Sequence, residues 1–140
     1  MTENDFNAEL SKHLRKMTPE VHYIKASDKF TVGISDFLLW HKGTCAAVES
    51  KYVREWPRPS ANLLKHAFTG PQVTFLESVA LTKNKAYGLI GVGEEQKMYL
   101  VNWVQIPPSG NWTTRQFIEM QFTTFAIKDV DGLVRWIFNE

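Results

Sequence analysis

The sequence predicts a mixed α/β fold, in which helices flank a central β-sheet. Apolar residues recur every three or four positions over residues 5–17, as on a helix packed against a core. Two apolar, strand-like runs flank Lys42-Gly43, a dipeptide typical of a tight hairpin turn. A helical segment from residue 69 separates this hairpin from two further strand-like runs. The chain is therefore expected to return to the same sheet through a crossover helix.

The first helix is expected over residues 5–17, with Pro19 ending it. Its apolar side chains share one stripe, formed by Phe6, Leu10, Leu14 and Met17. Glu9 and His13 lie four residues apart on a flank of this stripe. That flank is predicted either to face solvent or to overlook the hairpin that follows. A short strand is expected over residues 21–24.

The hairpin brings two carboxylates together. If His41 lies opposite Thr44, then Asp36 lies directly opposite Glu49, with Lys51 diagonal to Asp36 on the same face. Facing residues of this kind hold their Cβ atoms about 4.5–5.5 Å apart, so the two charges repel unless a cation lies between them. Carboxylate oxygens suit Mg²⁺ or Mn²⁺, and the lysine is placed to hold a phosphate or orient water. The ordinary alternative is an exposed charge pair, which the apolar residues on both faces of the hairpin disfavour.

A long connection is expected over residues 52–70, where prolines bar a continuous strand or helix and residues 61–68 offer at best a short helix. Basic and aromatic side chains alternate along it, namely Arg54, Arg58 and Lys65 with Tyr52, Trp56 and Phe68. Such a mixture suits phosphate contacts and base stacking. The alternative is a surface loop held in place by its aromatic side chains.

The next helix is expected to begin at Thr69, with Thr69 as N-cap and Gln72 three residues later, as in a capping box. Gln72 also shares one side of this helix with Leu76, a side that faces the sheet. Gln72 is therefore interpreted either as a helix cap or as a residue that orients water or phosphate beside the carboxylates.

The remaining segments extend the sheet and close the chain. Strands are expected over residues 86–92 and 97–101, and one or two more over residues 117–127. A closing helix is expected over residues 130–138, despite Gly132. Its Trp136 and Phe138 are expected in the core, or else on a surface for a second subunit.

Asp36, then about twelve residues, then Glu49-Ser50-Lys51 across a hairpin resembles the motif of the PD-(D/E)xK nuclease superfamily, with Ser35 in place of its proline. Gly33, Glu9 on an upstream helix and Gln72 on a downstream helix extend the likeness over residues 5–105. They are similar to small Holliday-junction resolvases and phage nucleases of the RecU and VRR-NUC branches.

This resemblance implies a restriction-endonuclease-like core and a metal-dependent endodeoxyribonuclease selective for branched DNA. It implies one or two Mg²⁺ (or Mn²⁺) ions held by Asp36, Glu49 and the backbone carbonyl of Ser50, with Lys51 orienting the attacking water. Glu9 and Gln72 are expected beside the metal. DNA contacts are expected from the basic residues Lys12, Lys16, Arg54, Arg58 and Lys65. Two readings stay open beside it: a restriction-like or repair nuclease acting on duplex, flap or single-stranded DNA, and a nucleic-acid-binding protein without turnover.

Composition agrees with one domain over residues 1–140. The chain has 44% hydrophobic residues, and 16 Lys and Arg against 15 Asp and Glu leave a net charge of +1. The total charge therefore forces no general attraction to nucleic acid, although the part that carries the motif is the more basic. Cys45 is the single cysteine, so no internal disulfide can form, and it is expected as a buried thiol.

The sequence and the resemblance also predict where the protein is located and how it assembles. The chain shows no apolar signal core or spanning run, which predicts the cytoplasm. The resemblance implies that this is the cytoplasm of a bacterium or of a phage-infected host cell. Cutting a four-way junction takes two nicks related by symmetry, and a two-fold dimer presents two identical sites with that relation. A homodimer is therefore expected.

Overall fold

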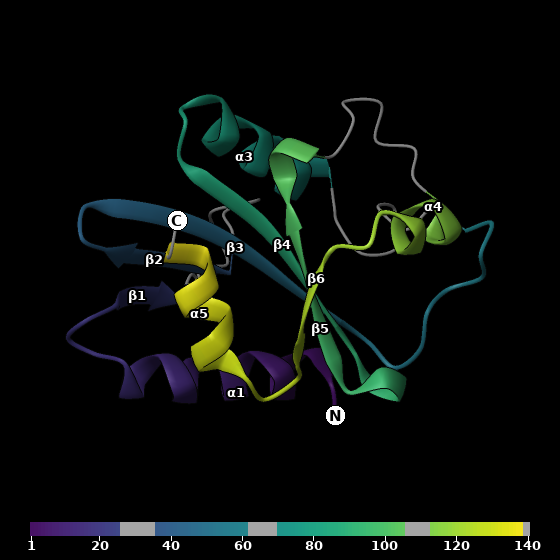
Figure 1. Ribbon diagram of the computed structural model, residues 1–140, viewed down its shortest axis with the longest axis horizontal. Coiled ribbons are helices and arrows are strands. Elements are labelled where there is room, and N and C mark those ends of the chain that lie inside the picture. Colours follow the sequence, from purple (N-terminus) through teal and green to yellow (C-terminus); the bar gives the residue numbers. More distant parts are fainter. Residues whose placement is uncertain (26–35, 62–69, 106–112, 139–140) are drawn as a thin grey trace.

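A six-stranded mixed sheet runs through the middle of the protein, with helices on both faces (Figure 1). This computed structural model describes residues 1–25, 36–61, 70–105 and 113–138. The strands are β1 (His22–Lys25), β2 (Phe37–His41), β3 (Thr44–Val53), β4 (Lys85–Val92), β5 (Lys97–Asn102) and β6 (Thr123–Ala126). The α-helices are α1 (Glu3–Lys16), α3 (Gly70–Leu81), α4 (Thr114–Glu119) and α5 (Val130–Phe138). Short 3₁₀ turns follow β4 and β5, at Gly93–Glu95 and Trp103–Gln105.

The strands lie in the sheet in chain order, β1-β2-β3-β4-β5-β6. Neighbouring strands are antiparallel except β3 and β4, which run parallel because α3 crosses between them. The mixed α/β sheet and its crossover helix were both predicted, and both are confirmed.

The hairpin of β2 and β3 has the predicted register. His41 pairs with Thr44, Trp40 with Cys45 and Leu38 with Ala47. Lys42 and Gly43 form the turn with φ values of 47° and 80°. Two successive positive φ angles belong to the type of turn whose twist matches that of the flanking strands, so the turn fixes the register.

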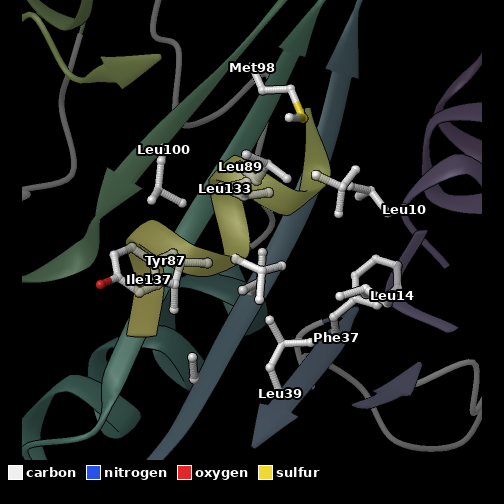
Figure 2. Packing of buried hydrophobic residues seen from close by; sticks show 14 of the residues in the cluster. Leu10, Leu14, Phe37, Leu39, Tyr87, Leu89, Met98, Leu100, Leu133 and Ile137 are labelled. Carbon is white, nitrogen blue, oxygen red and sulfur yellow. The ribbon is translucent and has the colours of Figure 1, made fainter. Parts of the chain in front are cut away.

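Each face of the sheet carries its own apolar core, because side chains alternate along every strand. One core joins α1 and α5 to alternate residues of the strands, and Figure 2 shows Leu10 and Leu14 of α1, Leu133 and Ile137 of α5, and Phe37 of β2 meeting there. The opposite core joins α3 and α4 to the other residues, including Ala47 and Ile90. The central strands are therefore covered on both faces.

Helix α1 packs very closely on β4 at Gly91. A Cβ atom at this position would lie 3.0 Å from Phe6 Cζ and 3.2 Å from Tyr52 Cδ2. The Phe6 and Tyr52 rings are themselves in contact, with centroids 5.8 Å apart. Glycine at this point therefore allows the first turns of α1 to approach the sheet.

Residues 117–127 contain one of the one or two strands predicted there, but their first residues belong to a helix that was not predicted. The segment Thr114–Glu119 is helical, and only Thr123–Ala126 is a strand. Thr113 and Gln116 form a capping box, in which each side chain bonds the backbone N–H of the other. This cap opens a helix of under two turns, which is too short for apolar periodicity to reveal.

The remaining expectations concern single residues and short segments. Cys45 is half-buried rather than buried, and its burial raises the pKa of the thiol. Trp136 is 45% exposed, whereas Phe138 packs at the edge of the α1/α5 core. Residues 62–68 of the expected short helix and the Thr69 cap fall outside the described residues. None of the helices described here is long and apolar enough to cross a bilayer.

Candidate active site at the start of the hairpin

The two carboxylates meet where β2 begins. Asp36 lies one residue before β2, and Glu49 is on β3, one position beyond the Phe37–Val48 pair. The backbone N–H of Asp36 donates to Glu49 Oε2 over 2.9 Å. Beyond the last paired residues of the hairpin, the Asp36 N–H is thus bonded by the Glu49 side chain, and this bond holds the two carboxylates together.

Ser50 binds the Asp36 carboxylate through two donors. Its backbone N–H lies 3.1 Å from Asp36 Oδ2, and its hydroxyl lies 3.0 Å from the same oxygen. The Ser50 hydroxyl is also in short contact with the side-chain amide of Asn7 on α1. Ser50 is fully buried and Asn7 is 8% exposed. Helix α1 therefore reaches the site through Asn7, which the sequence reading did not select.

Lys51 supplies the positive charge of the site. Its Nζ lies 3.5 Å from Glu49 Oε1 and 4.0 Å from Glu3 Oε1, at the start of α1. The lysine side chain is 16% exposed and that of Glu3 is 47% exposed. Because Glu49 is buried and Glu3 is not, the Glu49 pair is the better shielded from water.

Burial, and after it the negative charge of Asp36, raise the pKa of Glu49 to about 7. Lys51 and the hydrogen bond from the Asp36 N–H act in the opposite direction. Glu49 is only 1% exposed, so its charged form has little access to solvent. A cation that binds both carboxylates would remove this cost, as the sequence reading anticipated.

The donor set fits a small divalent cation. Each carboxylate has one oxygen fixed by the protein, Asp36 Oδ2 by Ser50 and Glu49 Oε2 by the Asp36 N–H. Glu49 Oε1 is buried and accepts no hydrogen bond from the described residues. In an extended strand the carbonyl of a residue lies on the same side as its N–H, so the Ser50 carbonyl is expected on the side of Asp36, to which its N–H donates. Within the described ranges no group of three or more His, Cys, Asp or Glu forms a metal site, so water and phosphate oxygens would complete the coordination shell.

Glu9 lies on a different side of α1 from Asn7. The two are two positions apart in the chain, which is about 200° around a helix. Glu9 Oε2 lies 3.6 Å from His13 Nε2, so the predicted Glu9–His13 pair is present, but it faces away from the Asn7 contact. The residues of α1 that reach the motif are Asn7 and Glu3. Asn7 carried one readable signal, since it stands seven positions before Leu14 and so shares the buried stripe.

Gln72 is half-buried in the first turn of α3. It precedes the fully buried Leu76 by four residues, so both lie on the side of α3 that faces the sheet. Leu76 packs in the same core as Ala47, and side-chain alternation along β3 places Ala47, Glu49 and Lys51 on one face. Gln72 therefore faces the layer that carries the motif.

The predicted DNA-contact residues are exposed where they are described. Lys12 and Lys16 lie on the outer side of α1, and Arg54 and Arg58 follow β3, whereas Lys65 is outside the described ranges. A separate groove of about 950 Å³ lies between the end of α1, the hairpin turn and α5. Its lining includes Lys16, Lys42 and Arg135 but none of the motif residues.

The aromatic residues of this connection are held by packing. Tyr52 packs against Phe6, and Trp56 packs edge-on against Tyr99 and tilted against Phe117, with ring centroids 5.1 and 5.7 Å away. The Trp56 indole N–H also donates to Glu95 Oε2 over 2.9 Å. Tyr52 and Trp56 therefore agree with the alternative prediction, a surface loop held in place by its aromatic side chains.

The sheet order, the parallel β3–β4 pair and the helices on both faces define a nuclease-like α/β fold, which confirms the predicted fold class. No protein-family model and no curated protein matches the chain. Among solved structures, the fold is similar to that of Hjc, a Holliday junction resolvase from the archaeal hyperthermophile Archaeoglobus fulgidus. The TM-score is 0.50 at 17% sequence identity, and the match covers 78% of this chain and 86% of the Hjc chain.

Proposed function

We propose that this protein is a metal-dependent endodeoxyribonuclease that hydrolyses phosphodiesters in branched DNA. The observation that carries the proposal is the buried pair of Asp36 and Glu49, with Lys51 Nζ 3.5 Å from Glu49, on a fold similar to that of a Holliday junction resolvase. A structural role alone does not account for the buried Glu49, because burial and the charge of Asp36 oppose its ionisation.

The metal would be held by Asp36, Glu49 and the Ser50 carbonyl, and Mg²⁺ or Mn²⁺ suits these oxygens. When bound, such an ion lowers the pKa of a coordinated water and neutralises charge on the phosphate and the leaving oxygen. Lys51 would orient the attacking water and hold a phosphate oxygen. Gln72 would orient water or phosphate from the side of α3.

Contacts with DNA would come from exposed cations that follow the site along β3 or lie farther along α1. Arg54 and Arg58 come after the strand that carries Glu49, and the later turns of α1 present Lys12 and Lys16. Such residues bind phosphates and do not read bases, so the selectivity would be for the shape of the DNA.

The test is a Mg²⁺-dependent cleavage assay on four-way junction, flap, linear duplex and single-stranded DNA. We expect the junction to be cut fastest, and Asp36→Asn and Glu49→Gln each to abolish cleavage while DNA binding persists. Glu94→Gln, at an exposed acid outside the motif, is the matched control and should cleave normally. Cleavage that survives in Asp36→Asn or Glu49→Gln would refute the site. A preference for duplex, flap or single strands would keep the nuclease but not the junction selectivity.

A further inference from the structure

A polar side chain interrupts the buried stripe of α1 beside the candidate site. Asn7 is 8% exposed and stands among the apolar residues that anchor α1, next to Phe6 and before Leu10. A buried amide costs free energy unless it is hydrogen-bonded, and a leucine would pack there at no such cost. The bond that Asn7 makes is to the hydroxyl of Ser50, 43 residues away in the chain.

The protons of this contact can be counted. The Ser50 hydroxyl has one proton and lies against two acceptors, the amide oxygen of Asn7 and Asp36 Oδ2 at 3.0 Å. A carboxylate can only accept, so both contacts are satisfied only if the amide turns over and presents its NH₂ group to the serine oxygen. The amide oxygen and nitrogen are nearly equal in size, so this rotation needs no other movement. The result is a directed chain, from the Asn7 amide to the Ser50 hydroxyl and on to Asp36 Oδ2.

We propose that Asn7 is a positioning residue for Asp36 and acts through the hydroxyl of Ser50. The amide fixes the serine proton on Asp36 Oδ2, which the Ser50 N–H also binds over 3.1 Å. With Oδ2 occupied twice, the carboxylate is held in one rotamer, and Oδ1 is the oxygen left to bind a cation. The inference rests on the proposed metal-dependent function and adds to it a buried residue of α1 that the sequence motif does not contain.

This chain of hydrogen bonds predicts that Asn7 and Ser50 are coupled in their effect on metal affinity, although neither side chain would bind the metal itself. Asn7→Ala and Ser50→Ala each break it, and groups that orient metal ligands are typically worth about 10–100-fold in metal affinity. Because both act through one chain, Asn7→Ala/Ser50→Ala should bind metal no more weakly than the weaker single variant. Asn4→Ala, at an exposed position of the same helix, is the matched control and should bind like the wild type.

Asn7→Leu separates positioning from packing. Leucine restores an unbroken apolar stripe, so the metal-free protein should melt at an equal or higher temperature than the wild type. Its Mn²⁺ affinity should nevertheless fall by about 10–100-fold. A residue that only supported the fold would not move stability and metal affinity in opposite directions.

The experiment is calorimetric titration of each full-length variant with Mn²⁺, together with thermal melting without metal. Wild-type Mn²⁺ affinity in Asn7→Leu and Asn7→Ala would overturn the positioning role and leave the nuclease assignment intact. Losses that multiply in the double variant would overturn the chain through Ser50. Wild-type protein that binds no Mn²⁺ and cuts no DNA would overturn this inference and the proposed function together.

Discussion

At the scale of single residues, Glu49 gives the protein a pH dependence whose sign can be worked out. Its pKa is about 7 when folded, against 4.5 for an ordinary glutamate. Below pH 4.5 the group is neutral in both states, and between these values the folded protein holds a proton that the unfolded chain has lost. The free energy of unfolding of the metal-free protein should therefore fall by about 3 kcal/mol as the pH rises from about 4.5 to about 7.

Chemical denaturation of metal-free protein across this pH range measures the effect. Glu49→Gln cannot titrate, so the difference between wild type and Glu49→Gln isolates the contribution of Glu49. Saturating Mg²⁺ should remove the decline, because a metal ion binds only the deprotonated carboxylate. Parallel pH profiles of the two proteins would contradict the burial of a titrating Glu49.

Lys51 is a second residue whose role can be separated from that of the acids beside it. Lys51→Ala removes the ammonium 3.5 Å from Glu49 but leaves both candidate ligands. We expect cleavage to slow by about 10²–10⁴-fold while Mn²⁺ and DNA still bind, since a positioned acid–base group contributes about that much. Lys97→Ala, at an exposed position of β5, is the control. If metal affinity collapses along with the rate in Lys51→Ala, the lysine holds the site together and does not act on water.

At the scale of elements, α3 carries Gln72 against the layer that contains the motif. We expect Gln72→Ala to lower the cleavage rate by about 10–100-fold and to change the melting temperature little. The reason is that the Gln72 side chain would orient water or a phosphate that other residues bind. Glu77→Ala, on the exposed side of the same helix, should leave cleavage unchanged. A lower melting temperature with normal turnover would identify Gln72 as a helix cap.

The elements also show how far the sequence can be read. The hairpin register could be predicted because Lys42-Gly43 fixes the turn, and every pair then follows by counting. The contacts of Asn7 and Glu3 could not be predicted, because periodicity indicates which side of α1 is buried but not which strand that side contacts. Glu9 was selected through the resemblance to related nucleases and not from periodicity. Residues 117–119 were predicted as strand instead of helix because a capping box, and not a long apolar pattern, starts the short helix α4.

At the scale of the whole molecule, a junction-cutting enzyme needs two sites, and the chain carries one Asp36–Glu49 pair. We expect a two-fold homodimer in solution, which presents two identical sites related by symmetry. The 45% exposed Trp136 on α5 offers one apolar contact for such an interface. Light scattering of the wild type measures the mass of the assembly. A strict monomer that cuts linear duplex as readily as junctions would contradict the resolvase assignment.

DNA binding by the same assembly should fall steeply with salt and vary little with base sequence, because phosphate contacts release counterions. Arg54→Ala and Arg58→Ala should each reduce the salt slope of log K by about 1. Lys83→Ala, at an exposed lysine that follows α3, serves as the control. Salt titrations of junction binding by the three variants make the comparison.

The close contact at Gly91 has a consequence for how tightly the site is tuned. Glycine at position 91 allows α1 to pack closely on the sheet, because a Cβ atom there would lie 3.0 Å from Phe6 Cζ. Asn7 is the next residue along the helix, so a methyl group at Gly91 would crowd the Phe6 ring directly beside the residue that contacts Ser50. The close packing of this part of α1 thus depends on a glycine of β4, a strand that contributes no side chain to the carboxylate pair.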